Sequence, residues 1–555
     1  MVGSVISYGS VVLFPSPTPR VSHRLLVTDE IDPDGLALLR AVPSFTVDEV
    51  PTLPADELLR RIGDYDAIIG RSATKISEPL LRAGTKLRVV GRAGVGVDNI
   101  ALDVATALGV AVINAPAGNT IAVAELFFGS VIGLLRHVPR ADQAMHAGRW
   151  ERAALMGTEL KGKTLGIVGL GRIGTAVAIR ARAFGMEVIA YDPYISESHF
   201  AVQQVRQMAT LDALLAAAQI CTVHVPLTDE TRGMIGATEL ARLRPGALVA
   251  NLARGGIIAE QALAASLTSG HLGGAVLDAY DNEPLTGEHA LRNVPGLMLL
   301  PHLGASTTEA QRNVAVDVCE SVRDALLEGE LSRSINVGGG PEDWRALQPA
   351  LVVTRRIASL ARACLADRGS RAIDSVTIKV GPELASASRV LLSAAAAGAL
   401  EGAVEQDRLN LINSRAVAAA RGIELSVSEG GDPPHPRAIE VRVRAGGDEL
   451  RVGGIAAIDA TPRITRIGRF QVDVALKSPI IVITNHDVPG VIGRVGTALG
   501  NAHVNIAEYH QARVAQGGEA LAVIAVDGPV GSVVREVLLG LPDVVTATIV
   551  QFRDA

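Results

Sequence analysis

A glycine-rich turn between a buried strand and a helix constrains this chain more than any other feature. Gly169, Gly171 and Gly174 follow an apolar run at Thr164 to Val168 and precede a helical stretch that ends near Phe184. In such a turn the first glycine permits a tight reversal, the second lets backbone N–H groups approach a pyrophosphate, and the third lets the helix pack closely on the strand. The spacing therefore predicts a dinucleotide-binding βαβ unit.

An acidic residue closes the next predicted strand. Asp192 follows the run Glu187 to Tyr191, at the separation from the glycines that is typical of NAD-binding folds. A carboxylate at this place accepts a hydrogen bond from the adenine ribose 2′-hydroxyl and repels a 2′-phosphate. We therefore expect NAD rather than NADP as the cofactor.

Two parallel α/β units are predicted, one on each side of a long helical segment. Short apolar runs alternate with amphipathic stretches from Arg24 to Pro116 and again from Lys163 to Pro301, which is the pattern of a parallel sheet covered by helices. A long helical pattern from Ile121 to Arg149 connects the two units. A second one, from Ser306 to Glu328, contains no Gly or Pro and returns the chain to the first unit, so that unit is expected to be discontinuous.

The C-terminal part of the chain has a different pattern. Its composition shifts at the Gly-rich segment Gly338 to Pro341, which marks a boundary. Beyond it, predicted strands mix with an Ala-rich helix from Arg389 to Val404, which indicates an α+β unit. The last segment, Ile480 to Phe552, gives the order strand, helix, two strands, helix, strand, which is the pattern of a ferredoxin-like unit.

Three side chains suited to acid–base chemistry follow predicted strand ends of the second unit: Arg254, Glu283 and His302. Ligands of open α/β sheets bind at the carboxyl ends of the strands, so we expect the three to converge. Histidine has a pKa suited to accepting a hydroxyl proton when an alcohol is oxidised, and a carboxylate on its far ring nitrogen would fix the tautomer. Arginine could polarise the carbonyl and hold a neighbouring carboxylate. Taken singly, His302 could equally be structural and Glu283 a solvated turn residue.

Length and charge bound the domain number and the partners. A chain of 555 residues predicts three to four domains at about 150 residues each. Its net charge of −6 leaves no general basic field, so neither nucleic acid nor a membrane surface is expected as a partner.

Cysteine usage and the N-terminus suggest a compartment. Cys221, Cys319 and Cys364 have no paired spacing, which fits a reducing environment and argues against disulfides or a metal site. No uncharged apolar run reaches about 18 residues, and Met1 to Arg20 lacks the features of a signal peptide. We therefore expect a cytoplasmic protein whose first segment, Met1 to Ser22, is a disordered extension.

Taken together, these motifs resemble the D-isomer-specific 2-hydroxyacid dehydrogenases, in which Arg, Glu and His in this order form the catalytic set. The resemblance runs from Arg24 to about Val337 and extends to the segments Gly91 to Asn99, Asn114 to Asn119 and Leu277 to Tyr280. Within that family, the segment Arg71 to Thr74 and the two C-terminal units resemble the long-form D-3-phosphoglycerate dehydrogenases, which carry an intervening domain and a terminal ACT domain.

The resemblance implies an α/β architecture with two added units. It predicts a discontinuous flavodoxin-like substrate-binding domain, a Rossmann-type NAD-binding domain, an α+β intervening domain and a ferredoxin-like ACT domain. In that order the expected boundaries are residues 23–120 with 305–337, 121–304, 341–475 and 480–555, after an extension at 1–22.

Site residues carry over by position in the matching motifs. The resemblance makes Arg254, Glu283 and His302 catalytic, and it makes four residues substrate contacts: Arg71, Ser72, Arg92 and Asn119. The expected cofactor-binding positions, with Asp278 placed for the nicotinamide amide, are Gly169, Gly171, Arg172, Ile173, Gly174, Asp192, Pro226, Thr228, Leu252, Ala253, Arg254, Asp278, His302, Leu303, Gly304 and Ala305.

The resemblance also implies regulation and assembly. Asn485, Asp487 and Asn505 match the effector loop of ACT domains, where serine would bind at a seam between two copies. The segment Arg149 to Arg152 falls where family members make dimer contacts, so a homodimer or homotetramer is expected. A degenerate ACT unit that serves assembly alone remains an alternative.

The implied activity is the NAD-dependent oxidation of 3-phospho-D-glycerate to 3-phosphohydroxypyruvate, the first step of L-serine biosynthesis, with feedback inhibition by serine. One alternative is another D-2-hydroxyacid dehydrogenase or a glyoxylate or hydroxypyruvate reductase, which the long C-terminal half and Arg71 disfavour. An alternative of another class is an NAD-sensing corepressor, but such proteins lack an ACT unit.

Overall fold

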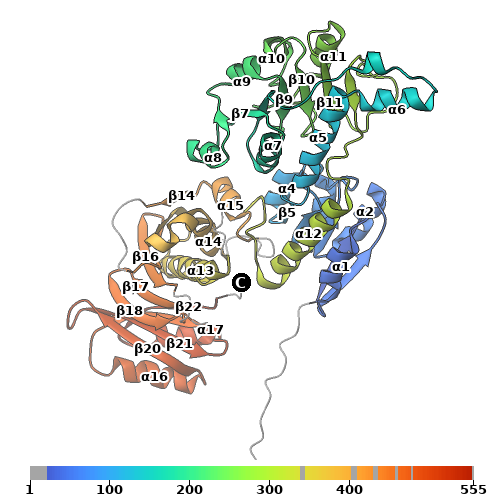
Figure 1. The fold of residues 1–555 in the computed structure, drawn as a ribbon. Coiled ribbons are helices and arrows are strands. Elements are labelled where there is room, and N and C mark those ends of the chain that lie inside the picture. Colours follow the sequence, from blue (N-terminus) through green and yellow to red (C-terminus); the bar gives the residue numbers. More distant parts are fainter. Residues whose placement is uncertain are drawn as a thin grey trace, which may run out of the picture.

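The computed structural model describes residues 22–337, 344–401, 409–428, 435–456, 461–476 and 479–552. The predicted disordered extension lies outside these residues, apart from Ser22. Within them the chain forms four β-sheets. Figure 1 shows an upper lobe in green, a middle lobe that combines the blue N-terminal elements with a yellow-green helix, and a lower lobe in orange and red.

The first sheet is parallel, with strand order β2-β1-β3-β4-β5. This order is that of flavodoxin-like folds. Its strands are β1 (His23–Val27), β2 (Phe45–Glu49), β3 (Ala67–Gly70), β4 (Val89–Arg92) and β5 (Ala111–Asn114), and its helices are α1 (Pro33–Arg40), α2 (Ala55–Arg61), α3 (Glu78–Ala83) and α4 (Leu102–Ala107).

A helix from much later in the chain completes this lobe. α12 (Thr308–Glu328) packs against α1 and β4, and a Cβ on Gly35 of α1 would lie 2.6 Å from the Ala315 carbonyl oxygen. Beyond α12, Asn336 accepts a hydrogen bond from the Val112 N–H at 3.0 Å. The expected return of the chain to its first unit is therefore seen directly in these contacts.

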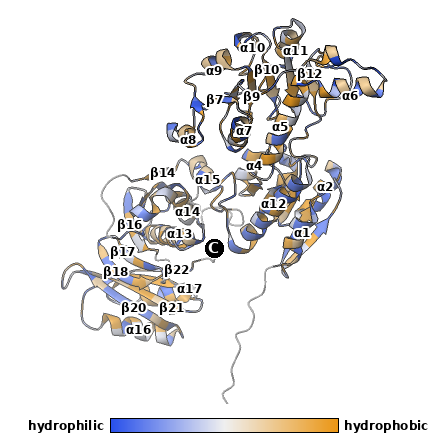
Figure 2. Cartoon of the chain, in the orientation of Figure 1, coloured by the Kyte–Doolittle hydropathy of each residue, from blue (hydrophilic) through white to orange (hydrophobic). Residues whose placement is uncertain are grey.

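The second sheet is also parallel, with order β12-β11-β10-β9-β6-β7-β8. The order reverses between β6 and β9, which is where doubly wound sheets bind their ligands. Its strands are β6 (Thr164–Val168), β7 (Glu187–Tyr191), β8 (Arg206–Gln207), β9 (Ile220–Val223), β10 (Leu248–Asn251), β11 (Gly274–Leu277) and β12 (Leu297–Leu299); the helices are α7 (Arg172–Ala183), α8 (Glu197–Val202), α9 (Leu211–Ala217), α10 (Ala237–Arg242) and α11 (Glu260–Thr268). Figure 2 shows apolar residues concentrated on β9 and β10, whose residues are buried.

The helical pattern from Ile121 to Arg149 is two helices rather than one. α5 (Thr120–Leu135) and α6 (Val138–His146) meet at 62°. His137 between them has a left-handed backbone with φ of +56°, and Pro139 stands in the first turn of α6. A proline lacks the N–H that would continue α5 and its ring clashes with the carbonyl four residues earlier, but it suits a first helical turn, so the break follows from Pro139. Among the described residues no single helix is long and apolar enough to cross a membrane; only the bent pair α5 and α6 passes that test together.

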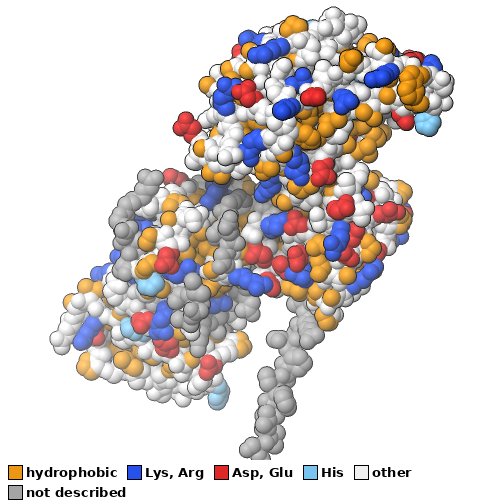
Figure 3. All heavy atoms as spheres, viewed as in Figure 1, with side chains coloured by type: hydrophobic (Ala, Val, Ile, Leu, Met, Phe, Trp, Pro, Cys, Tyr) orange, Lys and Arg blue, Asp and Glu red, His pale blue; other side chains and the backbone are white. Residues whose placement is uncertain are grey.

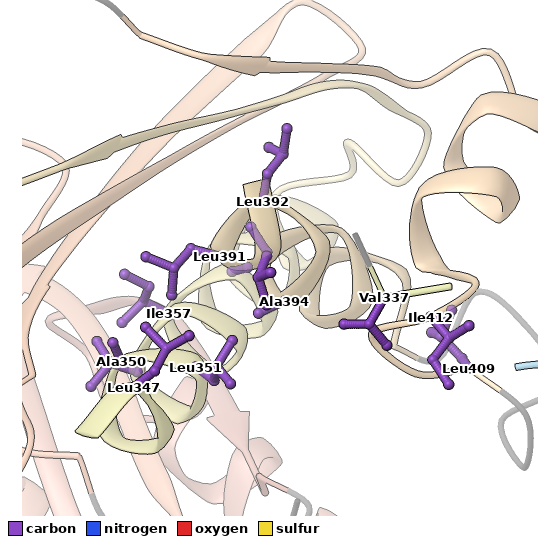
Figure 4. Close-up of a cluster of buried hydrophobic side chains, with 14 of the residues drawn as sticks. Val337, Leu347, Ala350, Leu351, Ile357, Leu391, Leu392, Ala394, Leu409 and Ile412 are labelled. Atoms are coloured by element: carbon purple, nitrogen blue, oxygen red, sulfur yellow. The ribbon is translucent and has the colours of Figure 1, made fainter. Parts of the chain in front are cut away.

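The third sheet belongs to the α+β unit and has order β14-β13-β15-β16-β17-β18. Its elements are α13 (Trp344–Asp367), β13 (Ile373–Val380), α14 (Ser388–Leu400), α15 (Ser414–Ala420), β14 (Glu424–Val427), β15 (Ala438–Ala445), β16 (Asp448–Ile455), β17 (Arg463–Ile467) and β18 (Phe470–Ala475). The predicted Ala-rich helix corresponds to α14, which ends at Leu400, while Val404 lies outside the described residues. Figure 4 shows Leu351 and Ile357 of α13 beside Leu391 and Ala394 of α14, all within one buried cluster.

The terminal sheet has the order β20-β21-β19-β22 with antiparallel pairs throughout. Its elements are β19 (Ile480–His486), α16 (Val491–Asn501), β20 (Asn505–Arg513), β21 (Glu519–Asp527), α17 (Ser532–Leu539) and β22 (Val544–Val550). This is the predicted ferredoxin-like order, and the expected fold class is confirmed.

Charges of both signs are mixed over the face of the molecule that Figure 3 shows. In the view of Figure 3, Lys and Arg side chains alternate with Asp and Glu over each lobe. Where the third and fourth sheets meet, Arg463 pairs with Glu508 at 2.9 Å and Arg469 pairs with Glu519. These arginines are thus neutralised by neighbouring carboxylates.

Candidate active site

Each of the three glycines in the turn after β6 is required for a different steric reason. Gly169 has φ of +92°, and a Cβ there would lie 2.7 Å from the His224 carbonyl oxygen. A Cβ on Gly174 would lie 2.1 Å from the Gly169 oxygen, so the helix could not pack. A Cβ on Gly171 would meet no described atom within 4 Å. The space at Gly171 lies before the first N–H groups of α7, where a pyrophosphate would fit.

Asp192 lies at the edge of this turn. Its Oδ2 accepts from the Leu170 N–H at 2.9 Å and its Oδ1 from the Tyr194 N–H at 3.0 Å. These bonds hold the carboxylate beside the glycines, and each oxygen keeps a lone pair for a further donor. The residues present therefore fit an NAD with its ribose at Asp192.

The loops after β9 and β10 are held by short local hydrogen bonds. Thr231 Oγ1 donates to the Pro226 carbonyl at 2.6 Å and accepts from the Thr228 N–H at 2.8 Å. After β10, the buried Asn251 accepts from the Ala253 N–H at 3.1 Å and donates to the Arg254 carbonyl at 2.7 Å. Asn251 thereby shapes the turn that carries Arg254, a role that the sequence motif did not reveal.

His302 and Glu283 form a direct pair. His302 Nδ1 lies 2.7 Å from Glu283 Oε2, and Glu283 Oε1 accepts from the Tyr280 N–H at 3.0 Å. The carboxylate thus accepts a hydrogen bond from Nδ1–H, which leaves Nε2 of the neutral ring as the base. His302 also has φ of +56°, a costly backbone for a non-glycine residue that is often found at functional sites.

The pair shifts both pKa values. The hydrogen bond that His302 donates to Glu283 raises the pKa of His302 above its ordinary value, although burial and the charge of Arg254 act in the opposite direction. Burial would raise the pKa of Glu283, but the hydrogen bond and charge of His302, together with the Tyr280 N–H bond and the charge of Arg254, hold that pKa below its ordinary value. The pair therefore favours a charged imidazolium once the ring has taken a proton.

Asp278 supports the turn that carries His302. Its Oδ1 accepts from the Leu303 N–H at 2.7 Å and its Oδ2 from the Gly304 N–H at 2.8 Å. The side chain is almost fully buried, and burial raises the pKa of Asp278 in spite of these two bonds. Both carboxylate oxygens thus bind the backbone of Leu303 and Gly304, and Asp278 in this way holds the turn next to His302.

Arg254 links the second sheet to the first. Its Nε donates to Asp98 Oδ2 at 3.1 Å, and Asp98 lies on the loop after β4. A Cβ on Gly96 of the same loop would lie 1.9 Å from Arg254 Nη2, so glycine leaves the space for the guanidinium. The loops of the two parallel sheets therefore meet at Arg254.

Positive charge accumulates at this meeting point. Burial and the nearby charges of Arg254 and Arg71 lower the pKa of Arg92 to about 10. Among the described residues, Arg92 Nε is buried without a hydrogen-bond partner. The carboxylates of Asp98 and Asp29 compensate in part. A buried guanidinium with an unused donor indicates a binding site for an anion.

The remaining predicted substrate contacts lie on neighbouring loops. Arg71 and the exposed Ser72 follow β3. Asn119 directly precedes α5, and its Oδ1 is buried without a partner in the described part of the chain. An unsatisfied amide oxygen of this kind costs free energy unless a ligand or water meets it.

The predicted effector residues do not all come together in one chain. Asn485 pairs with Ala520 on β21, whereas Asn505 pairs with Asp527 at the other end of that strand. At about 3.3 Å per residue the two ends are roughly 20 Å apart. A single site that uses both asparagines therefore needs a second copy of the chain.

Local contacts already occupy all three of these effector side chains, and Asn505 Nδ2 donates to Asp527 Oδ2 at 2.7 Å. Asp487 accepts from Arg513 Nη1 and from the Gly517 N–H, each at 3.1 Å. The Gly517 bond and the Arg513 charge hold the pKa of Asp487 below its ordinary value. Asn485 is almost fully buried and donates to the His486 carbonyl at 2.8 Å.

Comparison with known proteins identifies relatives of this site. The family model described as D-isomer specific 2-hydroxyacid dehydrogenase, NAD binding domain, matches residues 128–304. A D-3-phosphoglycerate dehydrogenase of Synechocystis sp. is 38% identical over 510 residues, which are 91% of this chain and 90% of that protein. One from Bacillus subtilis is 37% identical over 533 residues, or 95% and 99% of the two chains.

Solved structures resemble a smaller share of the chain. The TT0316 protein from Thermus thermophilus has a TM-score of 0.52 and 32% identity, covering 56% of this chain and 99% of its own. A glyoxylate reductase from Paecilomyes thermophila has a TM-score of 0.53 and 32% identity, covering 57% and 99%.

Proposed function

The chain belongs to the D-3-phosphoglycerate dehydrogenases within the D-isomer-specific 2-hydroxyacid dehydrogenase family, and we propose that its catalytic site lies where the loops of the two parallel sheets meet at Arg254. The reaction is the NAD-dependent oxidation of 3-phospho-D-glycerate to 3-phosphohydroxypyruvate, the first step of L-serine biosynthesis. The observation that carries the proposed site is the Glu283–His302 hydrogen bond beside Arg254, whose charge acts on both residues.

His302 is the general base of this site. Oxidation removes a proton from the substrate 2-hydroxyl group and a hydride from the carbon that carries this group. Nε2 of His302 takes the proton, because Nδ1 is committed to Glu283, and the carboxylate stabilises the imidazolium that results. NAD, when bound, supplies the acceptor for the hydride.

Three guanidinium groups bind the negatively charged groups of the substrate. Phosphoglycerate carries a carboxylate and a phosphate, and each prefers the planar fork of arginine. Arg254 holds the carboxylate and polarises the oxygen that becomes the carbonyl, while Arg71 and Arg92 complete the anion site. The unused Nε of Arg92 and the unpaired oxygen of Asn119 support this assignment.

Serine is proposed as a feedback inhibitor that binds between two terminal units. Asn485 and Asp487 of one copy and Asn505 of another would form each site, which requires a homodimer or homotetramer. The separation of the asparagines along β21 supports a site shared by two copies. The segment Arg149 to Arg152 supports assembly too, since its Trp150 is 79% exposed in the single chain.

The cytoplasm is the proposed compartment. Cys221, Cys319 and Cys364 are buried and free, and burial raises the pKa of each thiol to about 11 or 12. Buried neutral thiols of this kind suit a reducing environment.

The test is NADH formation by the purified chain with matched substrates. Activity with 3-phosphoglycerate should exceed activity with D-lactate and D-glycerate, because the latter two lack the phosphate that Arg71 and Arg92 would meet. Equal or greater efficiency with the unphosphorylated acids would favour a general 2-hydroxyacid dehydrogenase. NADH binding without turnover of any hydroxyacid would favour the corepressor hypothesis.

A further inference from the structure

Asp29 occupies an unusual backbone position at the carboxyl end of β1. Its φ is +59°, and the residue is only 8% exposed. A left-handed backbone is costly for a residue with a Cβ, although Asp tolerates it better than most. Such a conformation persists only where surrounding contacts hold it.

The contacts of Asp29 all lead to neighbouring loops. Oδ2 accepts from the Arg71 N–H at 2.6 Å and from the Thr74 N–H at 3.2 Å. Oδ1 accepts from Thr52 Oγ1 at 2.6 Å and from Thr74 Oγ1 at 2.8 Å. One buried carboxylate therefore binds both ends of the segment Arg71–Thr74.

Asn99 holds the same segment through its carbonyl groups. Its Nδ2 donates to the Arg71 carbonyl at 3.0 Å and to the Thr74 carbonyl at 2.7 Å. The N–H groups of Arg71 and Thr74 thus meet Asp29, and the carbonyl groups of the same two residues meet Asn99. With both ends of its backbone fixed, the segment offers Ser72 and the Arg71 side chain from a defined place.

We propose that Asp29 is a positioning residue for substrate recognition: through the three hydrogen bonds that it accepts from Arg71 and Thr74 it sets the shape of the Arg71–Thr74 segment, and so the place from which Arg71 reaches the substrate. This proposal rests on the proposed function, because it takes Arg71 as a substrate contact. Asp29 itself does not touch the reacting atoms. Its loss should weaken capture of the anionic substrate and leave the Glu283–His302 pair intact.

Two substitutions separate geometry from charge. In Asp29→Asn the amide oxygen can accept the two backbone N–H groups, and the amide nitrogen can donate to the hydroxyls of Thr52 and Thr74. The Thr74 proton then has an acceptor in Thr28 Oγ1, 2.9 Å away. Asn also tolerates φ above zero. Asp29→Gly keeps the backbone free of strain but removes all four hydrogen bonds.

The assay measures kcat and KM for 3-phosphoglycerate, together with calorimetric NADH binding. Asp29→Gly should raise KM about tenfold, as expected when a charge-assisted contact loses its fixed geometry, with kcat and the NADH dissociation constant within about threefold of wild type. Asp29→Asn should stay within about threefold of wild type in KM. In an Arg71→Ala background, Asp29→Gly should change KM by less than about twofold, because the contact it positions is already gone.

Several results would overturn the proposal. An unchanged KM in Asp29→Gly would show that the hydrogen bonds do not matter for recognition. A parallel loss of kcat and NADH binding would show a general structural role, and an Asn variant as impaired as the Gly variant would show that charge acts alone. Full additivity with Arg71→Ala would mean that Asp29 acts elsewhere. A wild-type chain inactive on 3-phosphoglycerate would remove the proposed function and this proposal together, whereas the other results leave the proposed function in place.

Discussion

Replacing Glu283 with Gln tests the central hydrogen bond of the site. The change keeps the size of the side chain but removes the charge that faces His302 Nδ1 at 2.7 Å. A hydrogen bond to a charged group contributes about 1.5–3 kcal/mol. The two side chains are 48% and 36% exposed, so solvent screening favours the lower end of that range. A loss of about 1.5 kcal/mol corresponds to a roughly tenfold fall in kcat/KM.

The pH profile gives the sharper readout. Glu283 raises the pKa of His302, and oxidation needs the neutral ring, so activity should rise with pH through that raised pKa. In Glu283→Gln the pKa of His302 falls, and the rising limb of kcat/KM should move to lower pH. The matched control is Asp142→Asn, which alters an exposed pair with His146 on α6 and should leave the profile unchanged. A limb that stays in place in Glu283→Gln would refute the assignment of His302 as the base oriented by Glu283.

Further substitutions test the cofactor and effector sites. Asp192→Ala should narrow the preference for NAD over NADP in kcat/KM by about tenfold, for the loss of about 1–2 kcal/mol in charge-assisted bonding; an unchanged ratio would mean that another residue meets the ribose. Gly171→Ala should fold normally but weaken NADH binding at least about tenfold, since its methyl group enters the space before α7. Gly174→Ala should instead lower the unfolding free energy by about 1–3 kcal/mol through overpacking; thermal unfolding and calorimetry distinguish the two, and equal effects would contradict the steric explanation. Asp487→Ala should leave turnover intact and abolish inhibition by serine; full sensitivity in that variant would leave the terminal domain as an assembly module.

Much of the fold is predictable because its signals are local. The strand before Gly169 and the strand before Asp192 are found where the apolar runs predict them, since buried parallel strands consist of short apolar segments. β2 (Phe45–Glu49) gives a weak sequence signal, because it lies at an edge of the sheet and none of its residues is fully buried. α13 (Trp344–Asp367) is also hard to predict, because Pro349 inside it interrupts the helical pattern.

The residues of the site are predictable only where they belong to a recognisable sequence motif. Arg254, Glu283 and His302 stand in recognisable strand-end segments, and the last two are found in direct contact. The roles of Asp29 and Asp98 cannot be predicted from the sequence, because their partners Arg71 and Arg254 lie on loops that are far away along the chain. Long-range hydrogen bonds of this kind leave no periodic signal in a single sequence.

NADH formation from 3-phosphoglycerate, compared between the intact chain and His302→Asn, tests the proposed mechanism at its base. We expect steady turnover in the intact chain and a fall in kcat of roughly 10²–10⁴ in the variant, the usual contribution of a general base, with NADH binding unchanged. Turnover close to wild type in His302→Asn would contradict the assignment of His302 as the base on which the mechanism depends.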